Sequence, residues 1–432
     1  MASAAEGTAE LTTVDDGVDR GSEHPERSPR VEFDHHSSEF AKDPVGAYRS
    51  IAARCPIAWT DAHGGYWVPT RYDDIWTIAR DDQTFSSART EFGGDGTAFI
   101  IPKRPGAVQL PIELDPPESV PYRRLLNPIL TRAAVENLHP LIRRVTTETI
   151  DSFVEQGNCD LVLDLANPVP AQVTLEWLGF GTGDWERFSL PLHDIFASPP
   201  GSDRLRRGEE GLGYIHERIR HLIEVRRANP SDDIVSYLIA GMIGDRPIND
   251  EELQSMIFLV ILGGVDTTTS LTGQALVHLA RNPEARSTLA SEPSLRETAT
   301  EEFLRVFAPS QSMARTVMAD TSLGGCALRR GDRILLPWVA ANFDAEAFPE
   351  PDEIRLDRMP NRHTSFGVGV HRCAGSHLAR AMFSEMLAQV LERLPDFQVD
   401  EAALVAYPSR GNQTGWDSVP ATFTPGARVG RG

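Results

Sequence analysis

The sequence predicts a mainly α-helical protein with a small β region. From residue 118 to about residue 305 the apolar residues recur mostly at helical spacing, with interruptions at prolines. Short strand-like runs bounded by turn residues occur in residues 65–90, around 313–338 and around 404–424. A length of 432 residues would suggest two or three domains. No Ser/Gly-rich linker divides the chain, so we expect one domain over residues 31–425.

The two ends of the chain are predicted to lie outside this domain. Residues 1–30 carry seven acidic side chains and three arginines, a composition typical of a disordered acidic tail. Residues 426–432 are interpreted as a C-terminal tail. The net charge of -20 argues against a nucleic-acid partner, because affinity for phosphate requires Lys and Arg. It also argues against an anionic membrane surface.

Cysteine usage and apolar runs indicate a cytoplasmic protein. Four cysteines without a C-x-x-C spacing form neither a zinc knuckle nor a disulfide framework in a chain of this length. A reducing cytosol is therefore the simplest compartment. The longest apolar run, residues 256–262, is far shorter than the ~20 residues of a membrane span. The N-terminus has no apolar signal region, so we expect no membrane segment.

A long helix is predicted over residues 249–281. Asn249 and Glu252 have the spacing of a capping box, and the helix would end at Arg281, before Asn-Pro. About 32 residues at 1.5 Å each span roughly 48 Å, so this helix must cross most of the molecule. Its centre, residues 263–269 (G-G-V-D-T-T-T), contains poor helix formers. Such a centre is either a functional site or a plain kink with Thr hydroxyls bonded back to carbonyls.

A second helix is predicted to begin at a further capping box, Ser294 with Glu297, and to end before Pro309. It contains Glu302 and Arg305, three residues apart. Taken alone, such a pair is usually a surface ion pair that contributes little to stability.

Residues 363–380 (H-T-S-F-G-V-G-V-H-R-C-A-G-S-H-L-A-R) predict a Gly-rich loop that leads into a helix. Cys373 lies at the junction, where free N–H groups and the positive end of the helix dipole favour a thiolate. His371 and Arg372 add positive charge beside the sulfur. A single cysteine is commonly a buried, inert residue, but these surroundings indicate a nucleophile or a metal ligand.

Together these three segments resemble the cytochrome P-450 family of haem-thiolate monooxygenases. Residues 366–375 match the haem-binding loop F-G-x-G-x-[HR]-x-C-x-G at every fixed position. Residues 263–268 match the oxygen-activation motif [AG]-G-x-[DE]-T-T, and Glu302 with Arg305 match E-x-x-R. Order and spacing also fit, over about residues 30–425. The resemblance implies the cytochrome P-450 fold, with a long central helix crossing the haem, and haem b (iron protoporphyrin IX) as cofactor.

The resemblance implies specific roles around the haem. Cys373 resembles the axial thiolate ligand of the haem iron. Phe366 and the backbone N–H groups of the loop, including Gly367, would shield and orient the sulfur. Gly263 and Gly264 would leave room over the haem.

Three cations occupy positions at which the family binds the haem propionates: Arg123, Arg315 and His371. Many relatives have His four residues before the first of these, whereas this chain has Ser119. One propionate contact is therefore in doubt.

The resemblance also assigns the proton chemistry. Asp266 and Thr267 resemble the acid–alcohol pair that delivers protons to dioxygen, which needs two protons before its O–O bond breaks. Glu302 and Arg305 would stabilise the fold behind the haem and take part in no catalytic step.

The substrate pocket is expected to be lined by the Gly- and Pro-rich segment 91–114, since long loops tend to be functional. Further lining residues are expected by position: Leu259, Leu262, Gly263, Gln311, Met313, Asn412 and Gln413. The three amides suggest a pocket more polar than one for a bare hydrocarbon. The alternative is that these amides bond to backbone or point away.

The function implied is a monomeric monooxygenase that hydroxylates or epoxidises a small or medium organic substrate. It would use O2 and electrons from NAD(P)H through a reductase and a ferredoxin or flavodoxin, which would dock on a basic patch with Arg124, Arg362 and Arg372. Alternatives are a peroxide-using or non-redox haem-thiolate enzyme, and a haem-binding accessory protein. Asp266 with Thr267 favours the dioxygen route, and Cys373 argues against the accessory role.

Overall fold

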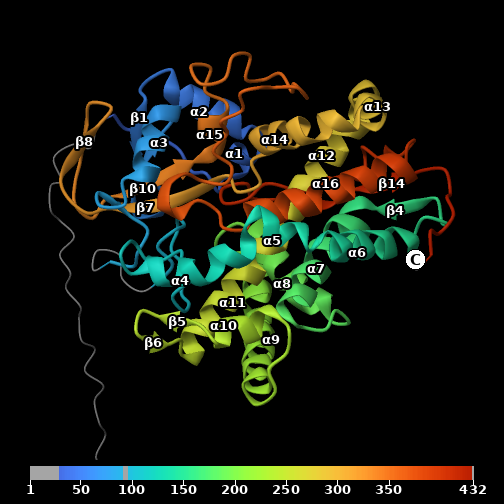
Figure 1. The fold of residues 1–432 in the computed structure, drawn as a ribbon. Coiled ribbons are helices and arrows are strands. Elements are labelled where there is room, and N and C mark those ends of the chain that lie inside the picture. Colours follow the sequence, from blue (N-terminus) through green and yellow to red (C-terminus); the bar gives the residue numbers. More distant parts are fainter. Residues whose placement is uncertain (1–28, 91–95, 431–432) are drawn as a thin grey trace, which may run out of the picture.

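The computed structural model describes residues 29–90 and 96–430. Helices dominate, and the main sheet lies at one end of the molecule, beside the first three helices (Figure 1). The expected mainly α-helical fold with a small β region is confirmed.

The main sheet has the order β1-β2-β10-β7-β3. Strand β10 runs parallel to β2, and the other neighbours are antiparallel. The strands are rich in aromatic and branched apolar residues, which suits a buried pleated surface. Their side chains form one hydrophobic cluster with the helices packed on the sheet. These elements are β1 (Ile57–Thr60), β2 (Tyr66–Pro69), β3 (Phe85–Ser86), β7 (Ser312–Val317), β10 (Arg333–Pro337), α1 (Ser38–Lys42), α2 (Pro44–Ala52), α3 (Tyr72–Arg80) and α15 (Trp338–Asn342).

The remaining helices form the larger, helical part. They are α4 (Ser119–Leu126), α5 (Arg132–Glu136), α6 (His139–Asp151), α7 (Pro168–Leu178), α8 (Trp185–Ala197), α9 (Asp203–Ala228), α10 (Ile234–Ile239), α11 (Asp250–Gly264), α12 (Asp266–Arg281), α13 (Pro283–Ser291), α14 (Arg296–Phe307) and α16 (Ser376–Arg393).

Small strands complete the chain. Two-stranded ribbons are formed by β5 with β6, β8 with β9, and β12 with β13, and a three-stranded sheet has the order β11-β14-β4. Their bounds are β4 (Asn158–Asp160), β5 (Met242–Ile243), β6 (Arg246–Pro247), β8 (Thr321–Leu323), β9 (Cys326–Leu328), β11 (Gln398–Val399), β12 (Val405–Ala406), β13 (Trp416–Ser418) and β14 (Pro420–Thr422).

The predicted long helix is present as α11 and α12, which meet at a break at Val265. The predicted capping box of Asn249 and Glu252 is confirmed. At the break the hydroxyls of Thr267 and Thr269 donate to the carbonyls of Gly263 and Val265, four residues earlier. Hydroxyls bonded back in this way bend helices, so the kink alternative is correct as far as the backbone is concerned.

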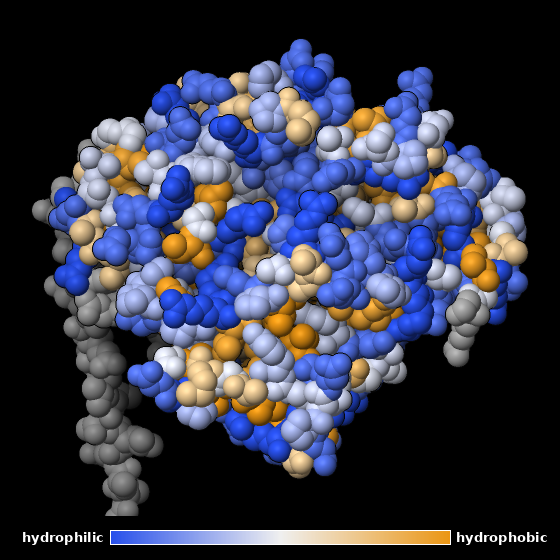
Figure 2. Space-filling model, viewed as in Figure 1, coloured by the Kyte–Doolittle hydropathy of each residue, from blue (hydrophilic) through white to orange (hydrophobic). Residues whose placement is uncertain are grey.

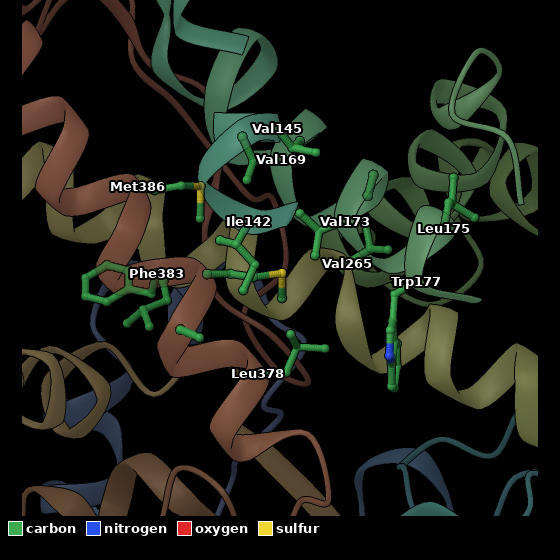
Figure 3. Packing of buried hydrophobic residues seen from close by; sticks show 14 of the residues in the cluster. Ile142, Val145, Val169, Val173, Leu175, Trp177, Val265, Leu378, Phe383 and Met386 are labelled. Carbon is green, nitrogen blue, oxygen red and sulfur yellow. The ribbon is translucent and has the colours of Figure 1, made fainter. Parts of the chain in front are cut away.

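The helical core surrounds this break. Side chains from α6, α7, α12 and α16 converge there, with Val265 beside Val173, and Ile142 close to Met386 (Figure 3). The centre of the long helix is thus fixed by packing on several sides.

One helix in the described part, Asp250–Arg281, is long and apolar enough to cross a membrane, although no single apolar run predicted this. Within its most apolar window 67 % is buried inside the molecule, as in a core helix. The face in Figure 2 is mostly hydrophilic, with small apolar areas over the lower helices.

The predicted tail boundaries need correction. Residues 1–28 lie outside the described residues, but Arg30 forms a bridge with Trp59 and therefore belongs to the fold. At the other end the Gly426 N–H donates to Val154, and Arg428 pairs with Glu155. Residues 426–430 therefore lie against the end of α6, where backbone and charge partners hold them.

The predicted capping box at Ser294 is wrong. A 3-10 turn, Pro293–Leu295, precedes α14, and no side chain caps that helix. The Pro at residue 293 starts the turn one residue too early for Ser294 to reach the helix N-terminus.

Candidate functional site

The cysteine loop folds as a tight hairpin between α15 and α16. The Cys373 N–H donates to the Phe366 carbonyl at 2.8 Å, which brings these two residues together. Gly367 and Gly369 have φ values of 65° and 74°, a region that favours glycine. A Cβ at Gly369 would also lie 2.7 Å from the Ala79 carbonyl oxygen. The two glycines are therefore required by the path of this loop.

Cys373 remains exposed although its loop packs between helices. Burial raises the pKa of its thiol, and the Gly375 N–H together with Arg123, Arg372 and Arg380 lowers that pKa only in part. The sequence correctly predicted that positive neighbours and backbone N–H groups lower the pKa of this thiol. The expectation that Cys373 is a thiolate therefore stays a prediction for the protein with a metal bound.

The three predicted cations come from separate elements and gather near the loop. Arg123, on α4, donates to the Arg372 carbonyl at 2.6 Å. His371 Nε2 lies 3.0 Å from Asp115 Oδ1. Arg315, on β7, is 3 % exposed and donates to the Ala314 carbonyl.

Arg315 has no carboxylate within ion-pair distance among the described residues, and burial lowers its pKa to about 10. A buried guanidinium without a counter-ion is costly. An anionic group next to it would remove that cost. The two propionates of haem supply such charges, and a bound metal would favour the thiolate form of Cys373. The residues present therefore fit haem.

Asp115 is a site residue that the sequence analysis missed. Its carboxylate accepts hydrogen bonds from the Ser86 hydroxyl and the Ser87 N–H, and it faces His371. It orients the imidazole. The signal available was its place just before Pro116 and Pro117, at the start of the segment that carries Arg123. Ser119 is buried one turn before that Arg, on the same helix.

The two glycines of the central helix have different roles. A Cβ at Gly263 would meet no atom within 4 Å, and this residue is exposed in mid-helix. A Cβ at Gly264 would lie 3.0 Å from Thr174 Oγ1 on α7. Gly263 thus borders open space, as expected, whereas Gly264 permits close helix packing. The expectation that Gly264 leaves room over the haem needs this correction.

Asp266 and Thr267 point to different sides of the helix. The Thr267 hydroxyl donates to the Gly263 carbonyl at 2.9 Å, on the side of the open space. Asp266 is fully buried and bonds to His193 at 2.7 Å and to the amide of Gln413. Tyr407 lies 3.3 Å from its second oxygen. None of these partners of Asp266 was predicted as such.

Two of the three predicted pocket amides are engaged within the protein. Gln311 donates to the carbonyls of Phe307 and Ala308, and Gln413 donates to Asp266. For these two side chains the alternative interpretation is correct, and they do not form a polar wall. Asn412 accepts a bond from the Gln311 N–H through its backbone carbonyl.

The described part of the predicted loop, residues 96–114, packs against α11. Ser255 Oγ donates to the Val108 carbonyl at 2.6 Å and accepts from the Leu110 N–H at 2.8 Å. His35 and His36 both place Nε2 within 3.0 Å of the Ile101 carbonyl. Partly buried apolar side chains remain at the other predicted pocket positions, Leu259, Leu262 and Met313.

Glu302 and Arg305 form a buried network. Both side chains are 0 % exposed, and two bonds of 2.8 Å join them. Arg358 and the Arg355 N–H donate to the same carboxylate. The interpretation as a surface pair is wrong, because α15 and residues 349–361 cover this face of α14.

A pocket of about 480 Å³ opens beside the cysteine loop. Several arginines line it: Arg80, Arg362, Arg372 and Arg380. One of them, Arg380, is paired with Glu301. Arg124, Arg362 and Arg372 are exposed, so this face offers positive charge in a protein of net charge -20.

Comparison with known proteins places this geometry in context. The family model described as cytochrome P450 matches residues 184–405. A steroid C26-monooxygenase of Mycobacterium tuberculosis is 32 % identical over 408 residues, covering 93 % of this chain and 99 % of that protein. Cytochrome P450-terp of a Pseudomonas species is 30 % identical over 409 residues, covering 89 % and 95 %.

Solved structures agree with these matches. Mycobacterium marinum cytochrome P450 CYP268A2 in complex with pseudoionone has a TM-score of 0.83 at 26 % identity and covers 91 % of this chain and 99 % of that one. CYP109E1 from Bacillus megaterium in complex with testosterone has a TM-score of 0.80 at 26 % identity, with 90 % and 100 % covered.

Proposed function

Because the chain belongs to the cytochrome P450 family of monooxygenases, we propose that it hydroxylates or epoxidises a small or medium organic substrate with one atom of O2. The observation that carries this proposal is Cys373 in a complete loop, with Arg123, Arg315 and His371 brought together beside it from separate elements. We further propose a cytoplasmic monomer, in keeping with four unpaired cysteines.

Haem b is the proposed cofactor, and its iron supplies the redox chemistry that activates dioxygen when bound. Cys373 would be the axial ligand, with Phe366 and the N–H groups around Gly367 holding the sulfur in place. Arg123, Arg315 and His371 would hold the propionates. Asp115 would keep His371 in the orientation that this requires.

Thr267 and Asp266 are proposed to handle protons. The Thr267 hydroxyl lies next to the open space at Gly263 and can pass a proton from its Oγ1 into that space. The Asp266 carboxylate, one residue earlier on the other side of the helix, would relay protons toward this hydroxyl. Exclusion of bulk water by the packed core around Val265 would limit wasteful release of peroxide.

Replacing Thr267 by alanine is expected to leave the fold and the haem in place but to uncouple NADH consumption from product. General acid–base groups contribute about 10²-fold or more, so product per NADH should fall by about that factor while hydrogen peroxide rises. The measurement is product, peroxide and NADH in one assay. Thr272→Ala is the matched control, because that buried hydroxyl makes the same backbone bond one turn further on. An unchanged product yield in Thr267→Ala would rule out the proton role.

The electron donor is proposed to be a ferredoxin or flavodoxin, reduced by an NAD(P)H-dependent reductase. Support comes from the exposed Arg124, Arg362 and Arg372 near the cysteine loop, since a local positive patch can attract an acidic donor.

Arg372→Glu is expected to slow reduction by ferredoxin at low salt, and the difference should shrink as salt screens the charges. Stopped-flow reduction at several salt concentrations measures this. Reduction by dithionite should not change, and Arg207→Glu, exposed on α9, is the charge-matched control. Equal ferredoxin rates in Arg372→Glu and wild type would refute the proposed docking patch.

The substrate class needs a direct screen. The names and complexes of similar proteins refer to a steroid, testosterone, pseudoionone and hexadec-9Z-enoic acid ligated to an acyl carrier protein. These compounds are suitable first probes in a spin-shift assay. The engaged side chains of Gln311 and Gln413 support a more apolar pocket than the sequence suggested.

A further inference from the structure

A chain of charged side chains connects the centre of the long helix with the surface. It starts at Asp266, which is 0 % exposed, and continues to His193, whose side chain is 5 % exposed. His193 Nε2 lies 3.0 Å from Asp417 Oδ1. Arg204 donates two hydrogen bonds to the Asp417 carboxylate, at 2.6 and 2.8 Å, and a third to Asp194. The side chains of Asp417, Arg204 and Asp194 are 18 to 30 % exposed. This series of charged side chains therefore reaches solvent.

Both nitrogens of the His193 ring face a carboxylate oxygen. Nδ1 lies 2.7 Å from Asp266 and Nε2 lies 3.0 Å from Asp417. A neutral imidazole has only one N–H, whereas an imidazolium has two. The geometry therefore favours the charged form. Burial lowers the pKa of His193, but Asp266 and Asp417 outweigh it and raise that pKa to about 9.

Four elements supply these charged side chains. Asp266 belongs to α12, His193 and Asp194 to α8, Arg204 to α9 and Asp417 to β13. Tyr407, which follows β12, places its hydroxyl 3.2 Å from His193 Nδ1. Three carboxylates are thus balanced by two cations. Without His193, only Arg204 would remain, and it does not touch Asp266.

We propose that His193 is a positioning residue: its imidazolium holds Asp266 on the α8 side of the helix and links it to solvent through Asp417 and Arg204. This inference rests on the proposed monooxygenase function, in which Asp266 restores protons to Thr267. His193 is the one cation that contacts the buried Asp266 carboxylate among the described residues, so its loss would leave that carboxylate without a charged partner.

The charge of His193 makes a pH-dependent contribution to stability. Its pKa is higher in the folded protein than the ordinary value near 6.5, so the contribution is fully present below about pH 6.5. It is lost as the pH rises through about 9. Thermal unfolding from pH 6 to pH 10 should show wild type well above His193→Gln at pH 6, with the gap closing toward pH 10.

His216→Gln is the matched control. That histidine lies on α9 against Phe258 and Gln254, and burial lowers its pKa. Its unfolding midpoint should run parallel to wild type from pH 6.5 to pH 10. The double variant His193→Gln/Asp417→Asn removes one carboxylate along with the cation. It should regain part of the midpoint lost in His193→Gln.

Two further readouts decide the role of His193. In NMR with labelled histidine, the His193 resonance should titrate more than one pH unit above the ordinary value near 6.5. In His193→Gln, product per NADH should vary between pH 6 and pH 8, where wild type is flat. A His193 pKa at or below 6.5, or parallel behaviour of His193→Gln and His216→Gln, would overturn the inference. If one of these outcomes overturns the inference while His193→Gln keeps the thiolate spectrum of wild type, the proposed monooxygenase function still stands.

Discussion

Replacing Cys373 by alanine is expected to abolish monooxygenase turnover. In the proposed site this sulfur is the one protein ligand of the haem iron, and no other described cysteine lies in the loop. The backbone of the hairpin should survive, because the N–H bond of residue 373 and the two left-handed glycines do not depend on the side chain. The measurement is product formation with purified redox partners, together with haem content.

Cys55→Ala is the matched control for this variant. Cys55 is half-buried near the main sheet, away from the loop, and its removal should leave turnover unchanged. Substantial turnover in Cys373→Ala would contradict the assignment of the ligand.

Replacing Glu302 by alanine is expected to produce the largest loss of stability. Removal of one partner from a buried ion pair costs about 3–5 kcal/mol, against a typical stability of about 5–15 kcal/mol. The change would leave Arg305 and Arg358 buried without their carboxylate. The midpoint of urea unfolding should fall sharply. Glu401→Ala, in an exposed pair with Arg281, is the control and should not move it measurably.

Lowering the pH is expected to weaken the same network of Glu302, Arg305 and Arg358. Burial raises the pKa of Glu302, but Arg305 and the Arg355 N–H outweigh it and lower that pKa below its ordinary value of 4.5. The stabilisation is therefore present above about pH 4.5 and is lost as the pH falls through the lowered value. Wild type should lose stability over this range more steeply than Glu302→Ala, and equal slopes would contradict this account.

The sequence predicted features that local patterns determine. The Asn249 cap, the long helix and the cysteine hairpin follow from residues within a few positions of one another. The three motifs also identified the charge around Cys373. Burial was not predictable from these patterns, and it reverses the expectation that Glu302 and Arg305 form a surface pair.

Contacts between distant segments were likewise missed. Asp115 meets His371 because the fold brings the segment before α4 against the cysteine loop. His193 meets both Asp266 and Asp417 because the fold brings α8, α12 and β13 together. No spacing in the sequence encodes these pairings. The role of Gly264 was missed for the same reason, because it depends on close packing against Thr174 of α7.

The central claim is that Cys373 ligates haem iron as a thiolate. The most direct test is a carbon monoxide difference spectrum of the reduced, haem-loaded wild-type protein. The account predicts a band in the thiolate-ligated position, which Cys373→Ala lacks and Cys55→Ala retains. A wild-type spectrum without that band, with Cys373 intact and haem bound, would contradict it.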